Sequence, residues 1–314
     1  MHKATILFNP NSGRPKRDAE LNHAIGIIQS AGVRTELTVC RSSQEATDNT
    51  RCAVADGSDT VFACGGDGTI HDVIQGLAGT PVALAILPFG TANALAHDLK
   101  IPLRPSAAAK VMVEGKVRRI PLGRVEYEDF HGKSAARYFT VAAGIGVDAH
   151  LFYNLTSELK NSGGMAAYYL KALQLVASYN MRRFEVAYAN GSGHRQHASL
   201  TELLAVRIRF FGNVLRELVP GASLDCGDLR VVMCRTASRH AYLQYVAGTL
   251  LGRRWKIKGI DVVSSSEIVC QLPEKIESQG DKVYVEADGE LLGRLPARMT
   301  MVPDALSLVA PAAN

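Results

Sequence analysis

The chain has 314 residues, enough for about two domains that each bury a core of their own. Hydrophobic residues make up 47% and charged residues 21%, which is ordinary globular usage and excludes a disordered or low-complexity chain. The formal net charge of +5 favours anionic ligands or membrane surfaces, and no nucleic-acid partner is expected.

Cysteine usage and hydropathy indicate a cytoplasmic protein. The six cysteines lie far apart without a C-x-x-C pair, which predicts reduced, buried thiols rather than a disulfide or zinc framework. The first apolar run, residues 4–8, ends too early for a signal peptide, so no export is expected. The sequence has no unbroken run of about 18 apolar residues, so we expect any membrane contact to be peripheral, at the inner membrane face.

Short apolar runs alternate with helical periodicity over the first third of the chain. Strands are predicted at residues 4–8, 35–39, 60–64 and 82–87. Helices are predicted around residues 21–28, 43–55 and 70–77. This succession is typical of βαβ units wound on both faces of a mostly parallel sheet.

Beyond about residue 116 the sequence becomes β-rich. Strands are predicted at residues 138–142, 184–188, 229–234, 283–287 and 299–302, with one helix at residues 165–179. The predicted fold class is α/β plus β, with an α/β domain over residues 1–120 and a β-rich domain over residues 121–300. One interpretation of the C-terminal segment, residues 301–314, is that the chain returns there to the first domain.

Polar glycine turns follow three of the predicted strands, at residues 9–13, 64–69 and 88–96. The carboxyl ends of parallel strands share one edge of a sheet, and turn amides bind phosphate oxygens there. The turns therefore predict a phosphate site in one crevice. Asp67 would offer an oxygen ligand to the Mg²⁺ that accompanies a nucleoside triphosphate. An ordinary strand-to-helix turn with Asp67 near the N-cap is the alternative.

Other known nucleotide-binding and catalytic motifs match this sequence less well. Gly132-Lys133-Ser134 lacks the leading glycine of a P-loop, because that position is Tyr127. Residues 144–149 match G-x-G-x-x-A, but no clear helix with an acidic residue completes a dinucleotide fingerprint. No G-x-S-x-G elbow is present in the sequence, so an esterase interpretation has no nucleophile.

Six motifs occur in the order of a known family, and together they span nearly the whole chain. They are residues 9–13, 65–69, 88–93, 144–148, 224–229 and 288–290. With them the chain resembles the diacylglycerol kinase catalytic-domain family, which includes sphingosine, ceramide and bacterial lipid kinases. The resemblance implies a doubly wound α/β domain like that of NAD kinase and phosphofructokinase for the nucleotide. It also implies a β-sandwich-like second domain for the lipid substrate.

The resemblance implies ATP and Mg²⁺ as cofactors, with Asp67 organising the metal. Asp288 would be the general base for a lipid hydroxyl, with Glu290 in support. Without the resemblance, residues 283–292 indicate a β-hairpin with an Asp-Gly turn. The residues implied at the nucleotide are Asn9, Ser12, Lys16, Arg17, Gly65, Gly66, Gly68, Thr69, Gly90, Thr91 and Asn93.

Departures from the family pattern affect the expected substrate more than the chemistry. Cys226 replaces an acidic residue where some bacterial members hold a structural Mg²⁺, so that ion is not expected. Residues 93–96 match the sphingosine kinase form. The implied function is an ATP-dependent lipid kinase that acts on diacylglycerol or a related lipid at a membrane surface. The alternatives are a sphingosine- or ceramide-type kinase, an NAD-kinase-like enzyme with a soluble substrate, and a non-catalytic lipid- or nucleotide-binding protein.

The sequence allows more than one interpretation of several polar residues. Arg207, Arg209 and Arg216 flank Phe210-Phe211, which suits membrane approach, the wall of a lipid cleft or the outer face of a strand. The basic run at residues 252–258 contains Trp255 and suits either an anionic lipid surface or a solvated helix end. His194 and His197 are expected in an exposed loop rather than at a metal. The sequence leaves the oligomeric state open.

Overall fold

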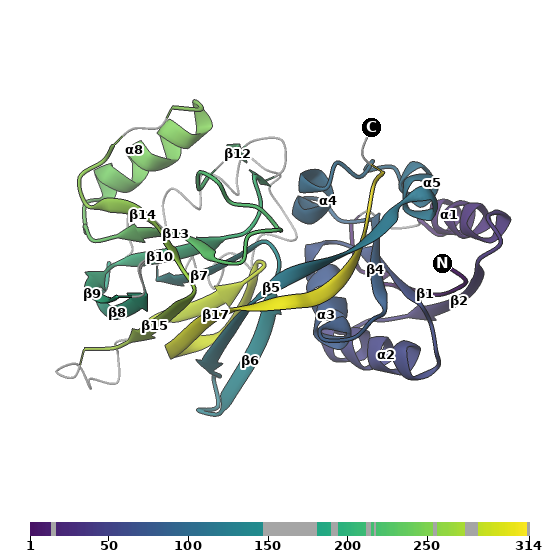
Figure 1. Ribbon diagram of the computed structural model, residues 1–314, viewed down its shortest axis with the longest axis horizontal. Coiled ribbons are helices and arrows are strands. Elements are labelled where there is room, and N and C mark those ends of the chain that lie inside the picture. Colours follow the sequence, from purple (N-terminus) through teal and green to yellow (C-terminus); the bar gives the residue numbers. More distant parts are fainter. Residues whose placement is uncertain are drawn as a thin grey trace. The chain divides into compact units, whose positions relative to one another are not determined.

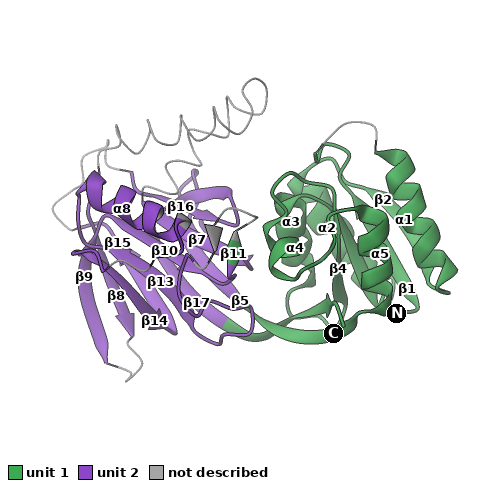
Figure 2. Cartoon of the chain, turned by 90° about the horizontal axis from the view of Figure 1, so that it is seen from above, with its two compact units in different colours: residues 1–122, 210–214, 302–314 green, residues 123–209, 215–301 purple. Residues whose placement is uncertain are grey.

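The computed structural model describes residues 1–13, 17–146, 181–189, 194–211, 215–216, 218–253, 256–273 and 282–312 (Figure 1). The chain divides into two compact units, coloured green and purple in Figure 2. Unit 1 comprises Met1–Leu122, Phe210–Val214 and Val302–Asn314, and unit 2 comprises Gly123–Arg209 and Leu215–Met301. Two long strands, β5 (Lys116–Glu128) and β17 (Glu290–Ala310), each run from one unit into the other.

Unit 1 is built on a parallel sheet. Its strands are β1 (Lys3–Phe8), β2 (Arg34–Val39), β3 (Thr60–Gly65) and β4 (Ala83–Pro88), in the spatial order β4-β3-β1-β2. The end of β17 pairs with β4 in parallel, with Ser307 opposite Ala83. β3 and β4 are buried along their whole length, because a parallel sheet covered on both faces selects continuous apolar runs.

Helices cover both faces of this sheet, which confirms the predicted α/β class. They are α1 (Asp18–Ser30), α2 (Ser43–Ala55), α3 (Asp67–Leu77), α4 (Ala94–Asp98) and α5 (Pro105–Glu114). α1 packs with α5 on one face and α2 packs with α3 on the other (Figure 1). α3 begins two residues after the carboxyl end of β3, and α4 follows β4 after the turn at residues 89–93.

Unit 2 is antiparallel. Its strands include β6 (Ser134–Phe139), β7 (Ala142–Gly146), β8 (Phe184–Ala189), β9 (Arg195–Leu200), β10 (Glu202–Val206), β13 (Leu229–Cys234), β14 (Ile260–Ser265), β15 (Glu267–Gln271) and β16 (Tyr284–Ala287). One run of neighbours is β14-β13-β10-β7-β16-β17, and a second is β17-β15-β8-β9. Inward side chains of both runs, such as Ile145 and Phe184, share one hydrophobic core. This confirms the β-rich second domain.

The remaining elements are a helix, α8 (Arg239–Leu250), and a two-stranded ribbon of β11 (Phe210–Phe211) and β12 (Leu215–Arg216). Among the described residues, no helix has the length and hydropathy needed to cross a membrane.

Three sequence predictions need correction. The predicted strand at residues 138–142 is interrupted, because β6 ends at Phe139 and β7 begins at Ala142. Cys52 is exposed and Cys226 is only half-buried, although all six cysteines are free and the other four are buried as expected. His197 lies on β9 rather than in a loop, and its side chain is exposed as predicted. The predicted helix at residues 165–179 and the glycine motif beyond Gly146 lie outside the described residues.

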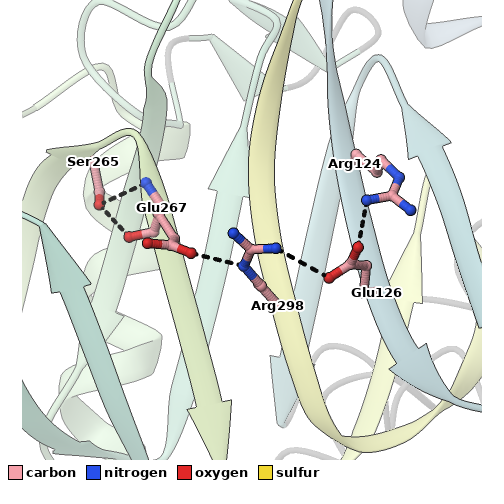
Figure 3. Close-up of polar contacts among 5 residues, drawn as sticks. All are labelled: Arg124, Glu126, Ser265, Glu267 and Arg298. Atoms are coloured by element: carbon pink, nitrogen blue, oxygen red, sulfur yellow. Dashed lines mark hydrogen bonds and ion pairs between the residues drawn. The ribbon is translucent and has the colours of Figure 1, made fainter. Parts of the chain in front are cut away.

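Charged side chains link three strands of unit 2 at their surface (Figure 3). Arg298 on β17 donates from Nε to Glu267 Oε1 on β15 at 2.7 Å and from Nη1 to Glu126 Oε2 on β5 at 3.5 Å. Arg124 donates to the other oxygen of Glu126, and the Ser265 hydroxyl donates to the Glu267 carbonyl at 2.6 Å. Hydrogen bonding and charge at Glu267 raise the pKa of Arg298. The ladder joins β5, β17 and β15.

Replacing Arg298 should weaken this junction. Arg298→Met removes the contacts to both glutamates, so we expect a lower Tm at low ionic strength and a smaller difference in 1 M NaCl, where charges are screened within about 3 Å. Arg51→Met is the control, because the partner of Arg51, Asp48, lies on the same helix and connects no strands. Equal Tm losses in both variants would contradict the role of the ladder.

Candidate active site

The three glycine turns of unit 1 touch one another through their backbones. A Cβ atom built on Gly90 would lie 2.4 Å from the Cα of Gly66, and one built on Gly13 would lie 1.9 Å from the Phe89 carbonyl oxygen. Gly13 also has a φ of +71°, a conformation that other residues rarely adopt. Glycine is therefore required at these positions, and the turns lie together as the sequence predicted.

Hydrogen bonds join the turns further. The backbone N–H of Asn9 donates to the Cys64 carbonyl at 3.0 Å, and that of Phe89 donates to the Gly65 carbonyl at 2.8 Å. These bonds continue the parallel sheet past its carboxyl edge.

Two polar side chains of the first turn converge on Thr69 of the second turn. Asn9 Nδ2 donates to Thr69 Oγ1 at 3.1 Å, and the Ser12 hydroxyl lies 3.3 Å from the same atom. Thr69 is buried, and Gly65 leaves room for it, since a Cβ on Gly65 would lie 2.3 Å from Thr69 Oγ1. The structure thus brings together three residues that the resemblance implies at a nucleotide.

Asp67 connects two helix starts. It is the first residue of α3, and its Oδ1 accepts from the Ala94 N–H, the first of α4, at 2.7 Å. A carboxylate is favoured at helix N-termini by the orphan amides and the helix dipole. Asp67 therefore fixes the spacing of α3 and α4 and also places negative charge beside the glycine turns.

Asn93 shapes the third turn. It has a φ of 48°, and its side chain accepts from the Gly90 N–H at 3.1 Å and donates to the Gly90 carbonyl at 2.9 Å. The side chain is buried, so its polar atoms serve the turn. Thr91 is exposed and Gly68 is half-buried.

Arg17 is held by its neighbours. Its Nη1 donates to the Phe89 carbonyl at 2.9 Å, and its guanidinium lies 4.6 Å from the centre of the Phe89 ring. Its Nη2 pairs with Glu20 at 2.7 Å. Lys16, implied beside it, lies outside the described residues.

In unit 2, Asp288 and Gly289 form the turn of a two-residue hairpin. Ala287 on β16 pairs with Glu290 on β17, and the φ values of Asp288 and Gly289 are 50° and 83°. Two positive φ angles match the twist of a tight hairpin, which Asp-Gly is suited to adopt. The hairpin predicted from residues 283–292 is confirmed.

The Asp288 carboxylate accepts hydrogen bonds on both oxygens. Oδ1 accepts from the N–H groups of Val141 at 2.8 Å and Ala142 at 3.0 Å. Oδ2 accepts from the N–H of Thr140 at 2.9 Å and from its hydroxyl at 3.1 Å. These amides turn toward the carboxylate instead of continuing a strand, which explains the break between β6 and β7. Glu290, next along the turn, is exposed.

Arg207 is a residue of this region that sequence reasoning misplaced. The side chain is 1% exposed, so neither membrane approach nor the outer face of a strand describes it. Its backbone N–H donates to the Val141 carbonyl at 2.9 Å, beside the amide that binds Asp288. The signal in the sequence was its apolar setting between Val206 and Ile208.

Among the described residues, no group of three or more His, Cys, Asp or Glu could hold a metal ion. Asp67 therefore belongs to no such group of described residues and offers its carboxylate beside the turns. That donor set fits Mg²⁺, which is commonly held by one or two carboxylates together with substrate phosphates.

Comparisons with known proteins agree over the whole chain. The model of the diacylglycerol kinase catalytic domain matches residues 3–125, and that of the YegS C-terminal NAD kinase beta sandwich-like domain matches residues 140–310. A diacylglycerol kinase of Bacillus subtilis (strain 168) is 27% identical over 314 residues, which cover 99% of this chain and 97% of that protein. One of Mycobacterium tuberculosis (strain H37Rv) is 28% identical, over 98% of this chain and 95% of that protein.

A solved structure shows the same fold. The crystal structure of a diacylglycerol kinase from Bacillus anthracis str. Sterne matches with a TM-score of 0.71 at 17% identity, over 99% of this chain and 97% of that chain.

The contact at Gly13 generates a stability prediction. Gly13→Ala should destabilise the protein more than Gly57→Ala. Both residues have left-handed backbones, with φ of +71° and +75°, so each alanine costs about 1–2 kcal/mol. Only the alanine at Gly13 meets another atom, because nothing lies within 4 Å of a Cβ at Gly57. Urea unfolding measures both. Equal losses would show that the turns can move apart.

Proposed function

Because the chain belongs to the diacylglycerol kinase catalytic-domain family, a lipid kinase family, we propose that it transfers the γ-phosphate of ATP to a lipid hydroxyl. The proposed acceptor is diacylglycerol or a related lipid. The observation that carries the proposal is the backbone contact of three glycine turns at the carboxyl edge of the unit 1 sheet. Ligands of open α/β sheets bind at that edge.

The turns supply hydrogen-bond donors for the oxygens of a polyphosphate. Glycines allow the backbone to approach phosphate oxygens closely, and α3 begins there with outward N–H groups. Asn9, Ser12 and Thr69 add side-chain donors within one cluster. Asp67 would hold Mg²⁺, which neutralises phosphate charge when bound.

In the proposed reaction, the lipid hydroxyl oxygen forms a bond to the γ-phosphorus. The bond from that phosphorus to the β–γ bridging oxygen breaks, ADP leaves, and the hydroxyl proton passes to a carboxylate. We propose Asp288 as the acceptor, supported by Glu290. Three of the four donors on Asp288 are backbone amides. The fourth is the Thr140 hydroxyl, which can rotate away and open one site on Oδ2.

We also propose that the protein meets its substrate as a peripheral protein on the cytoplasmic face of a membrane. A diacylglycerol resides in the bilayer, and the net charge of +5 favours an anionic surface. Liposomes of anionic lipid should therefore stimulate lipid phosphorylation, and this stimulation should weaken as salt is added.

The decisive assay is γ-phosphate transfer from labelled ATP with Mg²⁺ in mixed micelles. Diacylglycerol, monoacylglycerol, sphingosine and ceramide form the lipid panel, and NAD is the soluble control. We expect a labelled lipid in the wild type and a loss of at least about 100-fold in Asp67→Asn. Asparagine keeps an oxygen for the Ala94 N–H, so the variant should retain its Tm.

Asp48→Asn, an exposed change on α2, is the matched control and should keep full activity. Labelled NAD would replace the proposal with a soluble-substrate kinase. ATP binding without transfer to any acceptor would indicate a non-catalytic protein.

The two carboxylates of the hairpin turn should behave differently when their charge is removed. Asp288→Asn should abolish turnover and lower the Tm, because the amide nitrogen would face two N–H or O–H donors. Glu290→Gln should leave the Tm unchanged, since that side chain is exposed, and reduce turnover less. Activity assays and thermal scans measure both. Full turnover in Asp288→Asn would rule out Asp288 as the proton acceptor.

A further inference from the structure

Arg207 is the largest fully buried side chain among the described residues. A guanidinium keeps its charge in nearly every setting, so burial requires acceptors and negative charge around it. Its Nη2 donates to the Leu224 carbonyl at 3.0 Å, and its Nη1 lies 2.9 Å from Met301 Sδ. Arg207 therefore joins segments far apart in the sequence of unit 2.

Asp288 is the strongest of the acidic groups that act on this cation. Burial lowers the pKa of Arg207 to about 10, and the charges of Asp288, Cys226 and Asp225 oppose that shift, Asp288 most strongly. Of these acidic groups, the carboxylate of the hairpin turn therefore acts most strongly on the charge of the buried arginine.

The backbone places the two residues against one short segment. Val141 donates its N–H to Asp288 Oδ1 at 2.8 Å and accepts the Arg207 N–H on its carbonyl at 2.9 Å. Val206 and Ala142 form the neighbouring antiparallel pair of β10 and β7. The position of Arg207 is therefore set by the same strand junction whose amides hold Asp288.

We propose that Arg207 is a positioning residue for Asp288, supplying the buried counter-charge that keeps this carboxylate ionised against the amides of residues 140–142. The proposal rests on the proposed function, in which Asp288 accepts the lipid proton. Amide donors favour the charged form of a carboxylate, a nearby cation adds to that preference, and a protonated Asp288 would accept no further proton. Arg207 thereby acts through Asp288 and not on the substrate.

The test uses two neutral variants, Arg207→Met and Arg207→Gln, with Arg207→Lys as the charge-conserving rescue. Arg207→Gln retains a donor for the Leu224 carbonyl and serves if Arg207→Met does not fold. Arg209→Met is the control, because Arg209 is an exposed arginine two positions along the chain. Thermal scans confirm that each variant is folded.

The readout is the ¹³C carboxyl resonance of Asp288, titrated in the resting protein and assigned by its absence in Asp288→Asn. We expect the titration midpoint to rise by about one pH unit or more in both neutral variants. It should stay near the wild-type value in Arg207→Lys and Arg209→Met. In the kinase assay, kcat of the neutral variants should fall by about 100-fold with the KM for ATP unchanged.

An unchanged Asp288 titration in a folded neutral variant would overturn the proposal, and so would an equal shift in Arg209→Met. Because the resonance is read without turnover, the proposed function can fail separately. A wild type that phosphorylates no lipid, combined with a shifted titration, would refute the function and still support the action of Arg207 on Asp288.

Discussion

The backbones of Gly66 and Gly90 are in contact, and the candidate nucleotide site depends on that contact. A side chain on Gly90 would reach to within 2.4 Å of the Cα of Gly66, so the turn after β3 and the turn after β4 could not both keep their positions. With the turns together, Asp67 reaches the first amide of α4, and Asn9 reaches Thr69. Each of these polar contacts is short because the glycine backbones come so close.

Backbone amides position the carboxylate proposed as proton acceptor in unit 2, as they position Asp67 in unit 1. Asp67 and Asp288 are both held by backbone amides, one at a helix start and the other at a broken strand. Amide donors fix the direction of a carboxylate more firmly than flexible side chains do, because the backbone has little freedom once a sheet is formed. The buried Arg207 is the cation proposed to act on Asp288, whereas Asp67 lies beside turns suited to anions.

The local sequence pattern predicted the secondary structure correctly wherever a segment determines its own conformation. The buried strands β3 and β4 follow from continuous apolar runs, and the hairpin at Asp288-Gly289 follows from the need for two positive φ angles. Pattern was misleading at residues 138–142, where β propensity is high but the amides bind a carboxylate nearly 150 positions away. The burial expected for Cys52 was wrong, since it lies on the exposed side of α2.

By itself the sequence determined the order of elements, the α/β plus β class, the glycine turns and the Asp-Gly hairpin, because these depend on periodicity and on backbone freedom over a few residues. Only the tertiary structure decided that the Asp67 carboxylate accepts from the first amide of α4, that the Asn93 side chain bonds within its own turn, and that Arg207 is buried. Burial and pairing of a charge depend on segments brought together by the fold. The apolar neighbours of Arg207 in the sequence, Val206 and Ile208, indicate burial but do not identify the groups that surround its side chain.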